Sequence, residues 1–261
     1  MTLDKIESIQ LLRHDPDLAE FLEGDRLEQA RNDLVTRVVG FEPGNWAPLE
    51  RFGDLPKGLG LLVLDGLIIR RVGLGGRYGS ELLGDGDLLR PWQDEDPGPL
   101  PLRTGRWRVL RPGRLAVLDY DFAVRVARYP ELISCLLSRA VRRSRYMTTT
   151  MAILHQPRIG TRLHMLLWEL AVRWGNVSRD GVRLPVRLTH ATLAELVAAR
   201  RPTVTKALGE LAENDLVTWT GDHWLLKGSP PAELETLASM SIAAKAELSE
   251  NGGKTVAWPG A

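Results

Sequence analysis

Basic and hydroxyl side chains gather near the starts of two predicted helices, around residues 189 and 201. The guanidinium of Arg201 can donate two parallel hydrogen bonds to O6 and N7 of guanine, and Lys206 follows about one helical turn later. Hydroxyl, imidazole and backbone N–H groups at helix starts bind phosphate oxygens. The residues that we expect to contact phosphate are Thr189, His190, Arg200, Thr203 and Thr205. This chemistry suits duplex DNA.

The spacing of apolar residues predicts the elements that would position these groups. Thr189 is a good N-cap for a short helix. The residues of that helix expected to point inward are Leu193, Leu196 and Val197, and the small Ala194 is expected where the following helix crosses closely. After a turn at 198–200, a second helix begins near Pro202, because proline is tolerated in a first helical turn. Its inward residues are Val204, Ala207, Leu208 and Leu211. Two short strands around a turn at 221–222 then complete a winged helix-turn-helix over roughly residues 184–228.

Charge is distributed unevenly along the chain. Residues 139–210 contain thirteen basic and four acidic residues, whereas the whole chain has a net charge of only +1. A basic half joined to an acidic half indicates a polyanionic partner for the basic half. The alternative is a solvated arginine-rich face on a helix-turn-helix that binds another protein. DNA affinity that falls steeply with salt would distinguish the two.

The region before residue 119 has a different pattern of apolar, glycine and proline residues. Apolar residues at three- and four-residue steps predict short helices over 3–36. Between 38 and 118, short apolar runs separated by glycine and proline predict an antiparallel β sandwich or barrel. Asp65-Gly66 lies between two such runs and predicts a hairpin turn.

A long helix is predicted to follow, from about Tyr120 to His155, with an Asp119 or Asp121 cap and an interruption at Pro130. One apolar stripe runs along it: Phe122, Val126, Tyr129, Leu132, Ile133, Leu136, Leu137, Ala140 and Val141. Such a stripe favours pairing with a second copy of the chain, and packing on the β domain is the alternative. Another helix is expected over 160–174, followed by a loop over 175–183.

The chain resembles the Crp/Fnr family of bacterial transcription regulators. The likeness lies in Leu188-Thr189, Leu193-Ala194, Leu196-Val197 and Arg201-x-Thr203-Val204-x-Lys206-x-Leu208-x-x-Leu211, which match the family pattern LT...LA..V..SR.TV.R.L..L. The resemblance implies an α+β fold, with an N-terminal antiparallel β-roll (a double-stranded β-helix), a long dimerisation helix and a C-terminal winged helix-turn-helix. The expected boundaries are 1–118, 119–156 and 157–230, with a tail over 231–261.

The resemblance also implies a homodimer that reads a palindromic DNA site in the major groove. Arg201, Pro202 and Lys206 stand where the family's base-reading residues lie. Pro202 replaces a common glutamate, so the family's consensus half-site is not assumed. Ala198 replaces a common turn glycine, and Arg200 a common serine. RNA polymerase and an unidentified small-molecule effector are further candidate partners.

The candidate effector site departs from that of cyclic-nucleotide sensors. After Leu83–Leu89, the family's Gly-Glu, which binds the ribose, is replaced by Arg90-Pro91. Arg103-Thr104 falls where the phosphate-binding pair is expected. We therefore expect an effector other than a cyclic nucleotide, with a cyclic-nucleotide response through an altered pocket as the alternative. The candidate pocket residues are Arg90, Trp92, Arg103 and Thr104, and Trp46 and Trp107 could also line it or belong to the core.

Other classes of protein are disfavoured. The single Cys135 cannot build an intrachain disulfide framework or a multi-cysteine metal site. Residues 38–118 contain no histidine, which disfavours a cupin-like metal enzyme. We expect no catalytic residues, no metal and no cofactor. The longest apolar run, Leu59–Ile69, is interrupted by Asp65 and Gly66, and no signal pattern is evident, so we expect a cytoplasmic protein.

Overall fold

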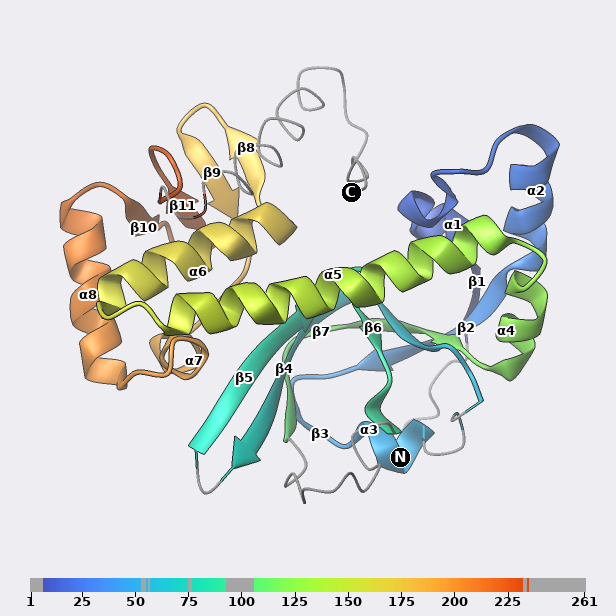
Figure 1. Cartoon of the computed structure of the whole chain (residues 1–261), viewed down its shortest axis with the longest axis horizontal. Coiled ribbons are helices and arrows are strands. Elements are labelled where there is room, and N and C mark those ends of the chain that lie inside the picture. The colour runs from blue at the N-terminus through green and yellow to red at the C-terminus, as the bar shows by residue number, and fades with distance from the viewer. Residues whose placement is uncertain are drawn as a thin grey trace. The chain divides into compact units, whose positions relative to one another are not determined.

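The structure is a computed structural model that describes residues 7–52, 55, 57–74, 77–92, 106–231 and 234. The chain forms two compact units, residues 1–146 and 147–261 (Figure 1). The boundary falls inside a long helix, and each unit is described by itself. Arg103, Thr104 and most of the predicted 231–261 tail lie outside the described residues.

The first unit is built on an antiparallel sheet. This confirms the antiparallel β architecture that was predicted for the N-terminal domain. Its strands are β1 (Glu7–Gln10), β2 (Val35–Phe41), β3 (Gly44–Trp46), β4 (Gly60–Leu74), β5 (Arg77–Gly84), β6 (Leu88–Leu89) and β7 (Trp107–Leu118). The path runs β1-β2-β7-β4-β5, with β3 paired to β7 and β6 to β4. The smaller helices of this unit are α1 (Leu11–His14), the 3-10 helix η1 (Pro16–Ala19), α2 (Gly24–Asp33) and α3 (Pro48–Phe52).

The prediction of helix throughout 3–36 is wrong at Glu7–Gln10. This segment is an edge strand, with Ile9 opposite Thr36 in β2. The apolar spacing of the segment fits a helix, but pairing with β2, nearly thirty residues later, satisfies its backbone and buries Ile9.

The predicted hairpin turn at Asp65-Gly66 is also wrong. β4 continues through both residues, and its register with β7 shifts around them, as in a β-bulge. Gly66 has φ +112°, and a β-carbon there would lie 2.5 Å from Cζ of Phe41. Glycine is needed at this position because the strand bends where Phe41 packs directly against its backbone.

Both faces of this sheet are buried. Leu62 and Ala116 face a core cluster that includes the helical residues Leu12 and Phe122. Their neighbours along the strands, such as Leu61, belong to a second cluster on the opposite face. Successive side chains of a strand point to opposite faces, so continuous apolar runs result where both faces are covered.

The second unit contains three helices and a small sheet. The helices are α6 (Ile159–Trp174), α7 (His190–Leu196) and α8 (Arg201–Glu213), and the strands are β8 (Asn176–Ser178), β9 (Gly181–Leu184), β10 (Val217–Trp219) and β11 (Trp224–Leu226). The predicted loop at 175–183 is wrong, because β8 and β9 form a hairpin there. β9 also pairs with β11, which extends the two-stranded wing to the order β10-β11-β9-β8.

The predicted break at Pro130 separates α4 (Tyr120–Val126) from α5 (Pro130–Leu154). Asp119 caps α4 by accepting a hydrogen bond from the backbone N–H of Phe122. The predicted apolar stripe divides in two. The members buried in the first unit are Phe122, Val126, Tyr129, Leu132 and Leu136, and the exposed members include Ile133, Leu137 and Val141.

Two arginines one turn apart fix α5 to the sheet and its connections within the first unit. Arg139 Nη2 lies 2.6 Å from Asp15 Oδ1, and its Nη1 donates to the carbonyl of Gly86. Arg143 donates to the carbonyl of Leu88 at 3.3 Å. Arg139 thus holds a carbonyl of the connection between β5 and β6, and Arg143 holds a carbonyl of β6 itself.

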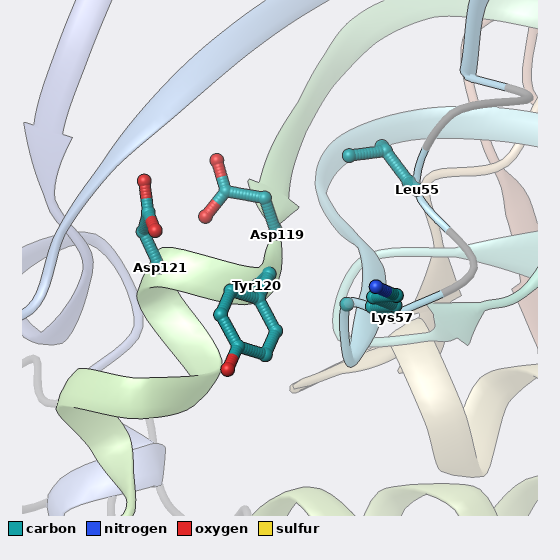
Figure 2. Close-up of a pocket in the computed structure, with 6 residues that line it drawn as sticks. Leu55, Lys57, Asp119, Tyr120 and Asp121 are labelled. Atoms are coloured by element: carbon teal, nitrogen blue, oxygen red, sulfur yellow. The ribbon is translucent and has the colours of Figure 1, made fainter.

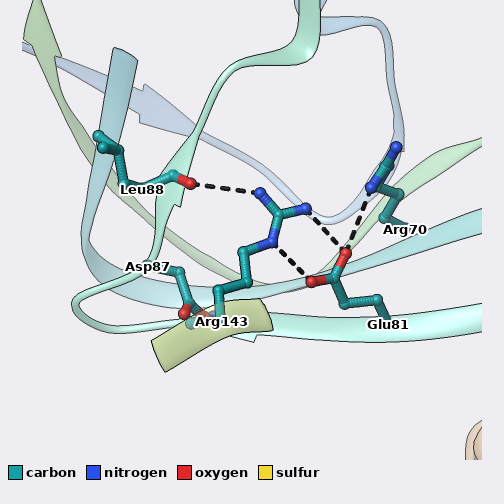
Figure 3. Close-up of polar contacts among 6 residues, drawn as sticks. Arg70, Glu81, Asp87, Leu88 and Arg143 are labelled. Atoms are coloured by element: carbon teal, nitrogen blue, oxygen red, sulfur yellow. Dashed lines mark hydrogen bonds and ion pairs between the residues drawn. The ribbon is translucent and has the colours of Figure 1, made fainter. Parts of the chain in front are cut away.

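Arg143 also meets Glu81 of β5 (Figure 3). Its Nε and Nη2 lie 2.6 and 2.8 Å from the two carboxylate oxygens, and Arg70 Nη1 approaches the same carboxylate at 3.4 Å. Burial alone would raise the pKa of Glu81, but hydrogen bonds and charge from Arg143 and Arg70 outweigh it and hold this pKa below its ordinary value. Glu81 is therefore ionised at neutral pH.

Replacing Glu81 with glutamine should lower the free energy of unfolding by about 3 kcal/mol at pH 7, because two largely buried guanidinium groups lose their shared counter-charge. Since folding lowers the pKa of Glu81, its contribution is present above the ordinary value of 4.5 and is lost as pH falls through the lower folded value. Urea unfolding of wild type and Glu81→Gln from neutral to acid pH measures this difference.

Asp65→Asn provides the control, since Asp65 pairs with Arg114 where both side chains are about 40% exposed. This pair should contribute less than about 1 kcal/mol. An equal loss in both variants, or a difference between wild type and Glu81→Gln that does not change with pH, would contradict the assigned role of Glu81.

Candidate nucleic-acid interface

The predicted cap of α7 is present. Thr189 Oγ1 accepts a hydrogen bond of 3.1 Å from the N–H of Thr192. The three residues predicted to point inward, Leu193, Leu196 and Val197, are buried, and so is the small Ala194. The hydroxyl of Thr189 is thus already part of the helix start, although the residue itself is exposed.

The turn between α7 and α8 is a Schellman motif. Ala199 N–H bonds to the carbonyl of Ala194, and Ala198 N–H to that of Glu195. Ala198 stands at the left-handed position with φ +51°, where helices usually have glycine. From α6, Arg162 donates to the carbonyl of Val197 at 3.2 Å and so satisfies the end of α7. Sequence analysis missed this role of Arg162, and no local pattern indicates it.

The start of α8 is strongly positive. Arg200 is its N-cap residue but makes no side-chain capping bond, and the first turn has no acidic residue. Arg200 and Arg201 are both exposed, at the helix end where the dipole is positive. Basic residues at this end oppose the dipole, at a cost of some tenths of a kcal/mol each. An anion bound there would relieve the repulsion.

α8 has the buried face and the exposed face that were predicted for it. The inward residues Val204, Ala207, Leu208 and Leu211 are buried. The residues that remain exposed are Arg201, Pro202, Thr203, Thr205, Lys206 and Gly209. Lys206 lies 3.7 Å from Glu210, with both side chains more than half exposed. Such a pair is weak in water and leaves Lys206 available to a phosphate or a base.

Two of the residues that were predicted to contact phosphate, His190 and Thr205, contact each other. His190 Nδ1 lies 2.9 Å from Thr205 Oγ1, and this hydroxyl donates its hydrogen to the carbonyl of Arg201. The imidazole must therefore carry its hydrogen on Nδ1 in this contact. The bond ties the start of α7 to the exposed side of α8 and leaves His190 Nε2 for an outside partner.

The wing contains no lysine or arginine between Val217 and Leu226. Trp219 stacks on Trp224 with ring centroids 5.0 Å apart, and Gly221 turns the chain with φ +104°. At the tip, hydrogen bonds from Thr220 and then His223 lower the pKa of the exposed Asp222. The hairpin of β10 and β11 therefore adds no lysine or arginine to those of α8, whereas β9 of the same sheet carries the exposed Arg183.

The candidate effector residues do not gather into one described pocket. Arg90 donates to the carbonyl of Gly58 at 3.4 Å and lies over the ring of Trp92. Trp107 is in the core, with Trp46 packed edge-on against it at 5.7 Å. Arg103 and Thr104 fall outside the described residues.

A shallow pocket of 410 Å³ lies instead at the start of α4 (Figure 2). Its lining residues are Leu55, Lys57, Gly58, Asp119, Tyr120 and Asp121. The carboxylate of Asp119 is used as the cap of α4.

In the described part of the chain, no group of three or more histidine, cysteine or acidic residues is arranged to hold a metal ion, and no helix is long and apolar enough to cross a membrane.

Together, α7, α8 and the four-stranded wing form a winged helix-turn-helix domain, and comparison with known proteins identifies its type. Residues 161–237 match the family model of the Crp-like helix-turn-helix domain. A CRP-like cAMP-activated global transcriptional regulator of Mycobacterium tuberculosis is 31% identical over 57% of this chain and 65% of the relative. A global nitrogen regulator of Synechocystis is 35% identical over 30% of this chain and 35% of the relative.

Solved structures agree on the fold. A cyclic nucleotide-binding domain containing protein from Listeria monocytogenes aligns with TM-score 0.60 and 15% identity, over 84% of this chain and 98% of that one. A CooA mutant from Carboxydothermus hydrogenoformans aligns with TM-score 0.58 and 15% identity, over 90% of this chain and 96% of that one. The predicted resemblance to the Crp/Fnr family is confirmed, and the second unit carries a Crp-like helix-turn-helix domain. The chain spans 65% of the length of the Mycobacterium relative.

Ala198→Gly should raise the free energy of unfolding by about 0.5–1 kcal/mol, because glycine adopts a positive φ without the steric cost that alanine pays. Ala199→Gly is the matched control in the same turn, since Ala199 does not have a positive φ. It should lose a similar amount through the added freedom of the unfolded chain. Urea unfolding measures both, and a loss of stability in Ala198→Gly would contradict the assignment of the turn.

Proposed function

We propose that this protein is a transcription regulator of the Crp type that binds duplex DNA through α8. The observation that carries the proposal is the start of α8. There Arg200 and Arg201 stand exposed at a helix N-terminus without acidic compensation, within a Crp-like helix-turn-helix domain. Arg201, Pro202 and Lys206 read base edges in the major groove. The phosphate contacts are Thr189, His190, Arg200, Thr203 and Thr205.

The exposed side of α5 supports a homodimer. We call its outward residues at alternating four- and three-residue steps the α5 seam: Ile133, Leu137, Ala140, Ser144, Met147 and Met151. All six are exposed, and Leu137 and Met151 are each more than 60% exposed. This spacing repeats every seven residues, as in helices that pair along a coiled-coil seam. A second copy of the chain covers this face, and a twofold dimer reads a palindromic site.

The effector of the first unit is not a cyclic nucleotide. Arg90 and Pro91 occupy the place of the family's ribose-binding glutamate, and Arg90 points to Gly58 and Trp92. Arg70 and Arg143 are engaged with the internal carboxylate of Glu81. The name of the Mycobacterium relative favours the second candidate, a cyclic-nucleotide-responsive regulator with an altered pocket. As a regulator, the protein acts in the cytoplasm together with RNA polymerase.

Selection of bound fragments from random duplex DNA, with and without cAMP, tests the proposal. We expect one palindromic site to be enriched at low salt in both conditions. Enrichment only with cAMP would favour the second candidate. If no palindrome is enriched in either condition, the helix-turn-helix does not read DNA as proposed, and protein contact becomes its role.

Arg201→Ala should weaken binding to the enriched site by about 1–3 kcal/mol and relax preference at one base pair in each half-site, because a bidentate contact to guanine is lost. Fluorescence anisotropy with single-base variants of the site measures both effects. Arg128→Ala removes a 70% exposed arginine from the first unit and is the control. If Arg201→Ala weakens binding equally on all DNA sequences, Arg201 contacts a phosphate and not a base edge.

Leu137→Glu should convert the dimer to a monomer, since it places two carboxylates in the apolar seam, and sedimentation equilibrium measures the mass. The residue is 63% exposed in the single chain, so the monomer should stay folded. Val124→Glu, at a 52% exposed position on α4 and outside the seam, is the matched control. A dimer that survives Leu137→Glu, or one that Val124→Glu dissociates equally, would rule out the α5 seam.

A further inference from the structure

Gly209 occupies an unusual place on α8. It is the ninth residue of a 13-residue helix, far from either cap. It lies one turn after Thr205 and Lys206, on the exposed face that begins with Arg201 and Pro202. Glycine in a helix interior costs about 1 kcal/mol relative to alanine, so its presence requires an explanation.

Packing within the described residues gives none. A β-carbon built on Gly209 meets no atom within 4 Å. By contrast, a β-carbon on Gly175, at the end of α6, would lie 2.4 Å from the carbonyl oxygen of Ala171. The φ of Gly209 is not positive, so its backbone does not require glycine either. Alanine would fit at 209 and would stabilise α8.

Small and long side chains both surround Gly209 on the exposed face of α8. Of its neighbours one turn away, Thr205 and Ala212 are small and exposed, whereas Lys206 and Glu213 are long, charged and exposed. The longer basic side chains of Arg201 and Lys206 lie towards the start of the helix. Between these side chains the helix backbone at Gly209 itself is uncovered, because a β-carbon there would meet no atom within 4 Å.

We infer that Gly209 sets how deeply α8 enters the major groove, by letting the helix backbone lie directly against the duplex. This inference rests on the proposed DNA-binding function. Glycine is used where a backbone must approach a ligand closely, because any side chain would hold the two surfaces apart. Glycine at 209 lowers the stability of α8. In the complex, the contacts that Arg201 and Lys206 make with the bases offset this loss. Gly209 is thus a positioning residue.

Variants that improve the helix but fill this space test the inference in the full-length protein. Gly209→Ala and Gly209→Gln both introduce better helix formers, so both should raise the urea midpoint. Both should also weaken binding to the duplex enriched by selection, from about 5-fold for alanine to about 100-fold for glutamine, as when atoms are forced into a packed contact. Anisotropy at fixed salt gives the affinities.

Gly160→Ala and Gly160→Gln are the matched controls. Gly160 lies in the first turn of α6, and its β-carbon would also meet nothing within 4 Å. These controls should leave DNA affinity within about twofold while the Gly209 variants lose it.

The outcomes separate this inference from the proposed function. If wild type binds the duplex and both Gly209 variants bind it as tightly or more tightly, the inference is wrong and the proposed function stands. Equal losses in the Gly160 variants would also overturn it, since they would point to a general effect of helix stiffness. If wild type binds no duplex, both fall together.

Discussion

The face of α8 available to a partner is determined by what its opposite face must bury. Val204, Ala207, Leu208 and Leu211 lie in the core of the second unit, and this burial fixes the rotation of the helix about its axis. Arg201, Lys206 and Gly209 consequently point outward together. The Schellman turn at Ala198 then sets where α8 begins relative to α7, and the contact between His190 and Thr205 ties their exposed sides. The outward direction of Arg201, Lys206 and Gly209 therefore follows from the burial of four apolar residues that would not touch DNA themselves.

Positive charge has two different uses in this chain. The excess of arginine between residues 139 and 210 indicates a polyanionic partner when it is read as sequence. In the structure, however, Arg139 and Arg143 are largely buried and hold α5 to the first unit, and Arg162 satisfies the end of α7. The part of the charge that can attract DNA is therefore smaller and more localised. It includes Arg200, Arg201 and Lys206, and the positive end of the α8 dipole adds to the charge of the first two.

The helix-turn-helix could be predicted from the sequence because its signals are local. A cap at Thr189, a proline in the first turn of α8 and apolar residues three and four positions apart depend only on near neighbours. The errors arise where distant residues decide. Asp65-Gly66 has the composition of a turn, but Phe41 and Gly113 pack against it and keep it within a strand. Glu7–Gln10 becomes a strand through β2, and the hairpin at 176–184 is held by β11. The ion pair of Glu81 with Arg143 joins residues 62 positions apart, which no spacing rule detects.

The regular spacing of the α5 seam has an evolutionary consequence. Each residue of an α-helix advances the chain by about 100° around the helix axis. Inserting or deleting one residue within α5 would therefore rotate every later seam position away from the earlier ones. A change of seven residues would nearly restore the alignment, since it amounts to almost two whole turns. If the seam pairs two copies, relatives of this protein should vary freely in the length of their loops and tails. The length of α5 should change by steps close to whole turns, such as seven or eleven residues, or not at all.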